Sequence, residues 1–159
     1  MDDVADAGIY AIEDSYLERY VQVGIASGRV VSVSFPDTVD EATLGEDQDH
    51  PIIDRFLEYL EGVREVEFDD VETALTVPTD QRAALEQVRA VPYGESVDVK
   101  TITRMTPGLD PNDQTDCTVV RTALDENPVP IIIPDHRVRD GPSAAPPAVE
   151  QKLRSLEGL

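Results

Sequence analysis

An alternation of apolar and polar residues marks residues 29–35, whose sequence is RVVSVSF. A β-rich run beginning at Tyr20 precedes this stretch, and the pair Ser27-Gly28 separates the two. Period-two alternation is typical of a strand with one buried face, and a Gly-containing pair between two such runs is typical of a hairpin turn. The pattern therefore predicts a β-hairpin over residues 20–37.

Residues 50–62 carry apolar side chains at helical spacing, namely Ile52, Ile53, Phe56, Leu57 and Leu60. Pro51 lies in the first turn of this pattern and Gly62 follows its last apolar position, as expected at the start and the end of a helix. The sequence predicts a helix over 50–62. It also predicts an acidic loop over 38–49 and one or two short strands over 66–77.

Helical patterns dominate the chain after Pro78, and the predicted helices span residues 79–91, 98–108, 115–127 and 148–159. Thr79 or Asp80 is expected to cap the first of them. Two short helices joined by a turn, with a third helix ahead of them, are the outline of a helix-turn-helix. The segment 128–138 is predicted to be extended because it contains three prolines.

The change of pattern at Pro78 predicts two small domains within the 159 residues. The first, residues 1–77, is an α/β unit built from a hairpin and a helix, and the second, residues 78–159, is helical, so the expected fold class is α/β (α+β). No apolar run approaches the length of a membrane span, and the acidic N-terminus has no apolar core. We therefore expect a cytoplasmic protein with no membrane partner.

The charge balance separates this chain from most cytoplasmic proteins. There are 33 Asp and Glu residues against 13 Lys and Arg residues, which gives a formal net charge of −20. Only two of the cations are lysines, Lys100 and Lys152, and the acids are spread over the whole length. Such a chain repels itself in dilute buffer, but at about 1 M salt the Debye length falls to about 3 Å. The composition indicates adaptation to concentrated intracellular salt.

Few residues are of the kinds that hold metals or form disulfides. Cys117 is the single cysteine, so no internal disulfide forms, and the bland interpretation of this residue is a small half-buried side chain. The two histidines, His50 and His136, do not stand at a metal-ligand spacing with other residues. The sequence therefore predicts neither a metal site nor a cofactor.

The stretch NPVPIIIPDHRV, residues 127–138, carries the most specific signal. It resembles the NPxPxxxPCHRV pattern of the alkylguanine-DNA alkyltransferases, also called methylated-DNA–protein-cysteine methyltransferases. The match is continuous except for Asp135, which stands where the family has cysteine. The PYG sequence at residues 92–94 is a weaker second anchor. The resemblance covers the C-terminal half of the chain, and the N-terminal half fits the family's first domain in outline.

The resemblance implies a ribonuclease-H-like first domain and a winged-helix-like second domain. In the family, the second domain binds the DNA minor groove and flips the damaged base into a pocket. The cysteine then takes the alkyl group from O6-alkylguanine, and the neighbouring histidine, here His136, draws off its proton through a water. Asn127 matches the asparagine that supports the active-site turn, and Arg137 matches the family's arginine. Three further positions match the prolines that shape the strand: Pro128, Pro130 and Pro134.

Several positions depart from the family pattern. Val99 falls where the family has a tyrosine that rotates a phosphate, and Thr118 falls near the arginine that fills the space of the flipped base. Arg121 lies one turn after Thr118 and is a candidate substitute. The loop over the pocket is replaced by residues 141–147, GPSAAPP, which look shorter and contain no tyrosine. The expected DNA contacts are Lys100, Arg104 and Arg121.

The leading hypothesis is a non-catalytic, alkyltransferase-like DNA-binding protein that senses alkylated or unusual bases for DNA repair. Its base pocket would be formed by Asn127, Pro134, Asp135, His136 and Arg137. Its partners would be double-stranded DNA, through the minor groove, and excision-repair proteins, and it would act as a monomer.

Two alternatives remain open. One is a methylated-DNA methyltransferase or dealkylase that acts through Asp135, since a carboxylate is able to form a methyl ester that later hydrolyses. The other is a scaffold or interaction module that has lost DNA binding. For the site itself, the structural alternative is an ion-pair and hydrogen-bond cluster in which His136 and Arg137 join Asp135 to fix the turn.

Overall fold

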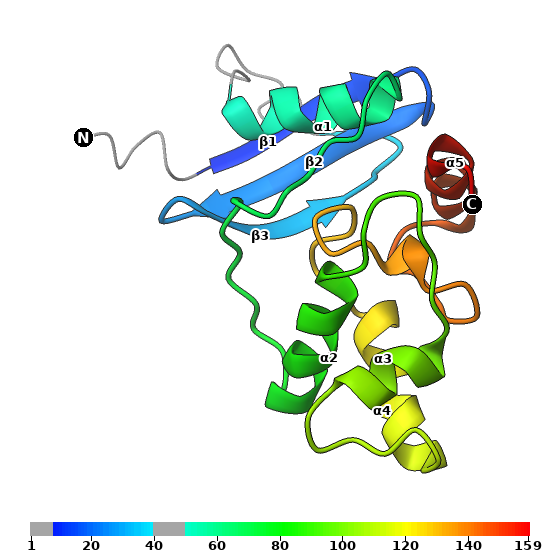
Figure 1. Cartoon of the computed structure of the whole chain (residues 1–159). Coiled ribbons are helices and arrows are strands. Elements are labelled where there is room, and N and C mark those ends of the chain that lie inside the picture. Colours follow the sequence, from blue (N-terminus) through cyan, green and yellow to red (C-terminus); the bar gives the residue numbers. More distant parts are fainter. Residues whose placement is uncertain (1–7, 40–49) are drawn as a thin grey trace. The chain divides into compact units, whose positions relative to one another are not determined.

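The computed structural model describes residues 8–39 and 50–159, so most of the predicted acidic loop, residues 40–49, lies outside the described residues. The chain divides into two compact units, Met1–Ala74 and Leu75–Leu159. The described residues form one three-stranded sheet, five α-helices and a short 3-10 helix (Figure 1). This mixed α/β fold confirms the predicted class.

The first unit contains an antiparallel sheet in the order β1 (Gly8–Asp14), β2 (Arg19–Ala26) and β3 (Arg29–Ser34). β2 and β3 form the predicted hairpin. Ser27 and Gly28 lie in its turn, both with the positive φ angles that its tight geometry requires. β1 was not predicted. It pairs with β2 along its whole length, from Gly8 opposite Ile25 to Asp14 opposite Arg19.

Helix α1 (Pro51–Glu61) packs against β1 and buries one face, as its periodicity predicts. The half-buried His50 side chain accepts a hydrogen bond from the Ile52 N–H at 3.1 Å and caps the helix. Gly62 ends the helix in the left-handed conformation, at a φ of 70°, and its N–H donates to the Tyr59 carbonyl. The predicted helix over 50–62 is confirmed together with its proline start and its glycine end.

The cap made by His50 gives a direct test of the packing of this unit. His50→Ala removes the acceptor for the Ile52 N–H and also the ring contact with Tyr10, whose centroid lies 4.9 Å away. We expect it to lower the free energy of unfolding by about 1 kcal/mol or more, whereas His50→Asn keeps a capping oxygen and should cost less. Urea unfolding followed by circular dichroism measures both. An equal loss in the two variants would show that the cap contributes nothing.

The strands predicted over 66–77 are absent. The segment is irregular and meets the sheet at a single bridge, where Thr73 lies beside Val30 of β3. There the Val30 N–H donates to the Glu72 carbonyl at 2.9 Å, and the Ala74 N–H donates to the Val30 carbonyl at 3.1 Å. Phe68 holds the segment down by packing its ring on those of α1. The apolar residues of this segment, which the sequence suggested were in strands, therefore reflect a buried aromatic side chain and a single bridge to the sheet.

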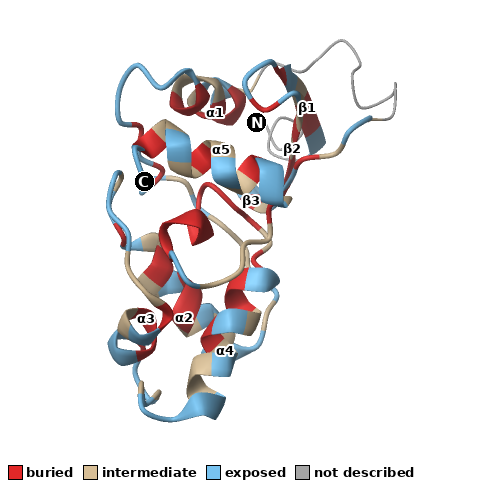
Figure 2. Ribbon diagram, turned by 90° about the vertical axis from the view of Figure 1, so that its right-hand side faces the viewer, coloured by how far each residue is buried: buried red, intermediate tan, exposed pale blue. Residues whose placement is uncertain are grey.

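The second unit is built from α2 (Thr79–Arg89), α3 (Val99–Met105) and α4 (Gln114–Asp125), which pack on one another, and from α5 (Pro147–Glu157). Figure 2 shows buried and exposed faces along these helices. Asp98 caps α3 and Asp113 caps α4 through their side-chain oxygens. The cap predicted for α2 is wrong in its position, because Pro78 is the N-cap residue and makes no side-chain cap bond. Asp80 lies inside the first turn, where its Oδ1 accepts from the Gln81 N–H at 2.8 Å. In the described ranges 8–39 and 50–159, no helix has the length and apolar character of a membrane span.

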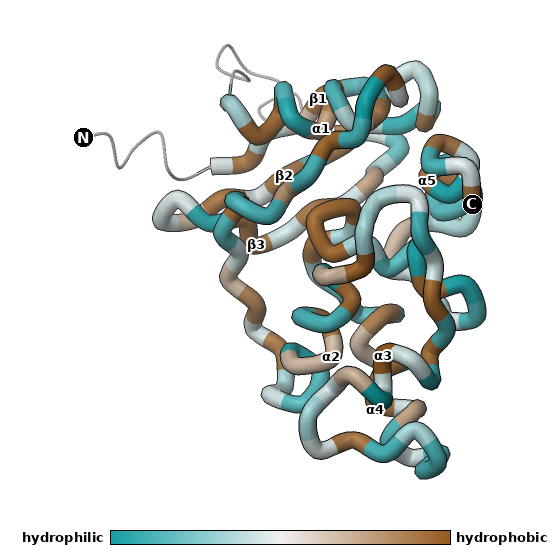
Figure 3. Tube along the Cα trace, in the orientation of Figure 1, coloured by the Kyte–Doolittle hydropathy of each residue, from teal (hydrophilic) through white to brown (hydrophobic). Residues whose placement is uncertain are grey.

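Residues 128–138 are not extended, contrary to the prediction. Ile131 has a φ of 78°, a left-handed conformation that is rare for a β-branched residue, and it reverses the chain so that Pro130 and Ile133 form a bridge. The chain then forms the 3-10 helix η2 (Asp135–Arg137). The three isoleucines of this turn are buried, and they form one of the hydrophobic stretches of the tube in Figure 3. Their burial supplies the apolar contacts that hold a strained turn in place.

Candidate functional site

Asn127, at the end of α4, holds the turn that precedes η2. Its side-chain amide N–H donates to the Ile133 carbonyl at 2.9 Å and to Asp135 Oδ2 at 3.0 Å, while its Oδ1 accepts from the Val129 N–H at 3.1 Å. Asn127 is itself buried. All these bonds are shielded from water, so together they define both the path of the turn and the position of the Asp135 carboxyl.

Asp135 is completely buried, with an exposed fraction of 0%. The Ser143 hydroxyl donates to its Oδ1 at 2.5 Å, and the Ala144 N–H donates to its Oδ2 at 3.1 Å. Burial raises the pKa of the Asp135 carboxyl above the usual range, and the hydrogen bonds from Ser143, Ala144 and Asn127 oppose that shift. The loop of residues 139–146 includes most of the segment that the sequence predicts to lie over the pocket, and it covers this carboxyl group directly.

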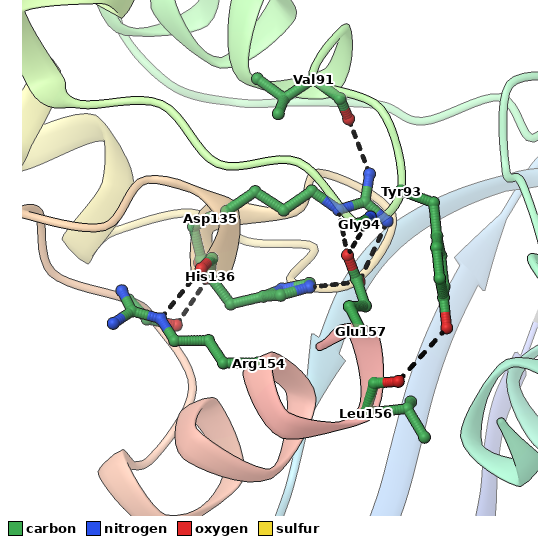
Figure 4. Close-up of polar contacts among 10 residues, drawn as sticks. Val91, Tyr93, Gly94, Asp135, His136, Arg154, Leu156 and Glu157 are labelled. Atoms are coloured by element: carbon green, nitrogen blue, oxygen red, sulfur yellow. Dashed lines mark hydrogen bonds and ion pairs between the residues drawn. The ribbon is translucent and has the colours of Figure 1, made fainter. Parts of the chain in front are cut away.

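His136 and Arg137 bind a different carboxylate, that of Glu157 at the end of α5 (Figure 4). His136 Nε2 lies 2.6 Å from Glu157 Oε2, and Arg137 donates from Nε to Oε1 at 2.8 Å and from Nη2 to Oε2 at 3.0 Å. The Gly94 N–H also donates to Glu157 Oε1 at 3.0 Å. The cluster was expected to form around Asp135, and this is wrong. His136 and Arg137 bind the Glu157 carboxylate, whereas the Asp135 carboxyl is bonded to other residues.

Further bonds tie the Glu157 cluster to the segment 91–94 and to α5. Arg137 Nη1 donates to the Val91 carbonyl at 2.7 Å, and its guanidinium group lies 5.6 Å from the centre of the Tyr93 ring. Arg154 donates from Nε to the His136 carbonyl at 3.0 Å. The sequence predicted His136 and Arg137 as site residues but missed Glu157, which has no local feature to distinguish it from the other acids of the chain.

The residues expected to contact DNA lie on another part of the second unit. Lys100 and Arg104 are exposed on α3, and Arg121 is exposed on α4, where its Nη1 donates to the Asp140 carbonyl at 2.9 Å. A groove of about 580 Å³ lies between these helices. Its lining includes two of the three cations and both departing family positions: Lys100, Arg121, Val99 and Thr118.

The groove also contains carboxylates that are already engaged. Asp140 Oδ1 accepts from the Val99 N–H at 2.7 Å, and Asp98 Oδ1 accepts from the Thr101 N–H at 2.8 Å. The bonds from Thr101 lower the pKa of the Asp98 carboxyl, so it is a stable anion at neutral pH. Cys117 also lines the groove, and its Sγ donates to the Pro111 carbonyl at 3.4 Å. Cations and anions are therefore interleaved on this surface.

The part of the chain that the structure describes contains no candidate metal site. No group of three or more His, Cys, Asp and Glu side chains there is arranged to hold an ion.

The chain is similar in sequence and in fold to known proteins of one class. No protein-family model matches the chain. It is 37% identical over 94 residues to the methylated-DNA–protein-cysteine methyltransferase of Methanopyrus kandleri, a match that covers 58% of this chain. The chain spans 66% of that relative, just under two thirds of its length.

Solved structures share the fold over nearly the whole chain. A variant of the Mycobacterium tuberculosis O6-methylguanine methyltransferase superposes with a TM-score of 0.71 at 20% identity, covering 96% of this chain and 91% of that one. Mycobacterium tuberculosis OGT in complex with DNA gives 0.67 at 20% identity, with 95% and 91% covered. The O6-methylguanine-DNA methyltransferase of Pyrococcus kodakaraensis gives 0.56 at 21% identity, with 96% and 100% covered. The chain is therefore similar in sequence to a methylated-DNA–protein-cysteine methyltransferase over 94 residues, and it shares the fold of these solved structures.

Proposed function

We propose that this protein is a non-catalytic, alkyltransferase-like DNA-binding protein that senses alkylated or unusual bases for DNA repair. It would act in the cytoplasm as a monomer, bind double-stranded DNA through the minor groove, and present the site to excision-repair proteins. The relative from Methanopyrus kandleri and the DNA complex of Mycobacterium tuberculosis OGT support DNA repair and DNA binding as the setting.

The state of Asp135 is the observation that carries the non-catalytic part of the proposal. Alkyl transfer needs a strong nucleophile with an open line of attack, and a thiolate meets this need better than a carboxylate. Asp135 is fully buried, both its oxygens accept hydrogen bonds, and burial raises its pKa. Each of these three properties makes its oxygen lone pairs less available to an incoming alkyl carbon.

The charges of the groove support a DNA contact that depends little on ion release. Lys100 and Arg121 are the cations of the groove lining, and Asp98 and Asp140 lie among them. At high salt, contacts to phosphates lose most of their counterion-release advantage. Binding would therefore rest on hydrogen bonds and shape rather than on the net charge of the surface.

We expect the wild-type protein to retain a duplex containing labelled O6-methylguanine in concentrated KCl without taking up the label. Filter binding measures retention, and gel analysis of the protein together with recovery of methanol measures transfer. An unmethylated duplex of the same sequence is the control for damage selectivity. Label on the protein, or released as methanol, would contradict the non-catalytic proposal and support the enzyme acting through Asp135.

The second candidate is an interaction module that no longer binds DNA. The closure of the 139–146 loop on Asp135 favours it, because a flipped base would have to break the bonds from Ser143 and Ala144 before it could enter. Absence of retention at every KCl concentration would support this candidate. An Asp135→Cys variant that gains transfer would exclude it, because transfer requires both DNA binding and an accessible pocket.

A further inference from the structure

The 139–146 loop supplies Asp135 with two hydrogen-bond donors that are neighbours in the chain. The Ser143 hydroxyl meets Oδ1 and the Ala144 N–H meets Oδ2, so one donor faces each oxygen of the carboxyl group. Oδ2 receives a further bond from Asn127. The bond from Asn127 belongs to the buried turn, whereas the two loop donors belong to a half-buried surface segment. The loop donors are therefore the exchangeable partners of Asp135.

The loop is held firmly at both ends and lightly between them. A side chain at Gly141 would place its Cβ 2.6 Å from Leu124 Cδ1, so this position packs closely on α4. Ala145 is buried at the other end, next to the start of α5. Between these anchors, the Ser143 side chain bonds, among the described residues, to Asp135 and to the Ala145 N–H. A local rearrangement of Pro142–Ala144 would release the two bonds from Ser143 and Ala144 to the Asp135 carboxyl.

We propose that Ser143 and Ala144 occupy the place of a nucleobase edge, and that the base which replaces them is an unpaired guanine. This inference rests on the proposed DNA-binding function and names its ligand. An ionised carboxylate only accepts hydrogen bonds, so its two oxygens require two adjacent donors. Guanine offers such a pair in its N1–H and its N2 amino group.

Other bases lack this pair on their pairing edge. Adenine and cytosine each place a ring acceptor beside their amino group, and thymine has a single N–H between two carbonyl groups. O6-methylguanine has lost the N1–H, so its N1 would face a carboxylate oxygen with lone pair against lone pair. The ligand class is thus a guanine with a free O6 that is extrahelical or mispaired, and such a base costs the least to flip.

The test compares duplexes that carry one bulged nucleotide, either guanine, hypoxanthine or O6-methylguanine, with a fully paired duplex as reference. Fluorescence anisotropy in concentrated KCl and mildly alkaline buffer gives the dissociation constants. We expect the guanine bulge to bind about tenfold more tightly than hypoxanthine, which lacks the N2 amino group, and than O6-methylguanine. Ser143→Ala should bind guanine more tightly still, because the competing loop donor is gone.

Asp135→Asn turns the site into one donor and one acceptor, which complements the N1 acceptor and N2 donor of O6-methylguanine. We expect the order of guanine and O6-methylguanine to reverse in this variant, while Asp69→Asn, an exposed change in the first unit, keeps the wild-type order. Thermal unfolding confirms that each variant is folded. Equal binding of all bulges, or an unchanged order in Asp135→Asn, would overturn the guanine inference and leave DNA binding standing. Absence of binding to every duplex would overturn the proposed function as well.

Discussion

Glu157→Ala is expected to lower the free energy of unfolding by about 3–5 kcal/mol, because it removes one partner of a buried ion pair. The Glu157 side chain is 0% exposed and that of Arg137 is 10% exposed. Glu157 accepts two bonds from Arg137 and one from the Gly94 N–H, and it also bonds to His136. Without it, the guanidinium group keeps the Val91 carbonyl as its one hydrogen-bond acceptor among the described residues.

Urea unfolding of the full chain in concentrated KCl, followed by far-ultraviolet circular dichroism, measures the loss. Glu150→Ala is a matched control on the same helix, since Glu150 pairs with Arg154 at 2.9 Å in the i,i+4 arrangement and is more exposed than Glu157. That change should cost less than about 1 kcal/mol. If the two variants lose the same amount, the Glu157 cluster contributes no more than a surface pair.

The elements that were predicted well are those whose signals are local. The helix α1 carries its proline start, its glycine end and its apolar face within one short stretch, and nothing distant competes with them. The β2–β3 hairpin likewise depends on alternation and on the Ser27-Gly28 turn. Signals of this kind act between residues that are close in the chain, so a sequence pattern is enough to read them.

The elements that were missed depend on partners far along the chain. β1 is stabilised by pairing with β2, and residues 66–77 remain irregular because only Thr73 pairs with the sheet. Residues 128–138 reverse direction at Ile131, although β-branched residues favour extended structure. Burial of the isoleucines outweighs that preference, and an apolar run alone does not separate a buried strand from a buried turn.

The residues named for the candidate site stay a prediction, and the sequence did not predict which carboxylate pairs with the two basic side chains. Asn127, Asp135, His136 and Arg137 meet around η2, as the motif indicates, yet the acid that binds the two basic side chains is Glu157. The choice between two carboxylates is made by the packing of α5, which no local pattern specifies. As a result, η2 contains the buried Asp135, which is bonded to neutral donors, next to His136 and Arg137, which bind Glu157.

The burial of the Asp135 carboxyl leads to the second large effect, a stability that falls as pH rises. Burial raises the pKa of Asp135 in the folded protein, whereas in the unfolded chain the pKa returns to about 3.9. Between these two values the folded state binds the proton more tightly than the unfolded state does. The free energy of unfolding contributed by this group is therefore largest below about pH 4 and is lost as pH rises through the folded-state pKa.

Asp135→Asn removes this titration while keeping the shape of the side chain. Its amide oxygen accepts from Asn127 and Ala144 in the place of Oδ2, and one amide N–H donates to the Ser143 hydroxyl, whose own hydrogen loses its acceptor. That cost is the same at every pH, so it does not change the slope of the difference. The variant should therefore gain stability relative to the wild type as pH rises. The expected slope of the difference is about 1.4 kcal/mol per pH unit within the window between the two pKa values.

Urea unfolding of both proteins from about pH 5 to about pH 8 gives the difference at each pH, which cancels the titration of all other acids. Asp98→Asn is a control whose difference from the wild type should stay constant over this range, because the Thr101 bonds lower the pKa of Asp98 in the folded protein. Its wild-type residue contributes stability that is present above about pH 4 and is lost as pH falls through the lowered folded-state value. A pH-independent difference between wild type and Asp135→Asn would mean that the buried carboxyl titrates as an ordinary aspartate. In that case, the only remaining reason for Asp135 not to act as a nucleophile would be that Ser143 and Ala144 cover its carboxyl group.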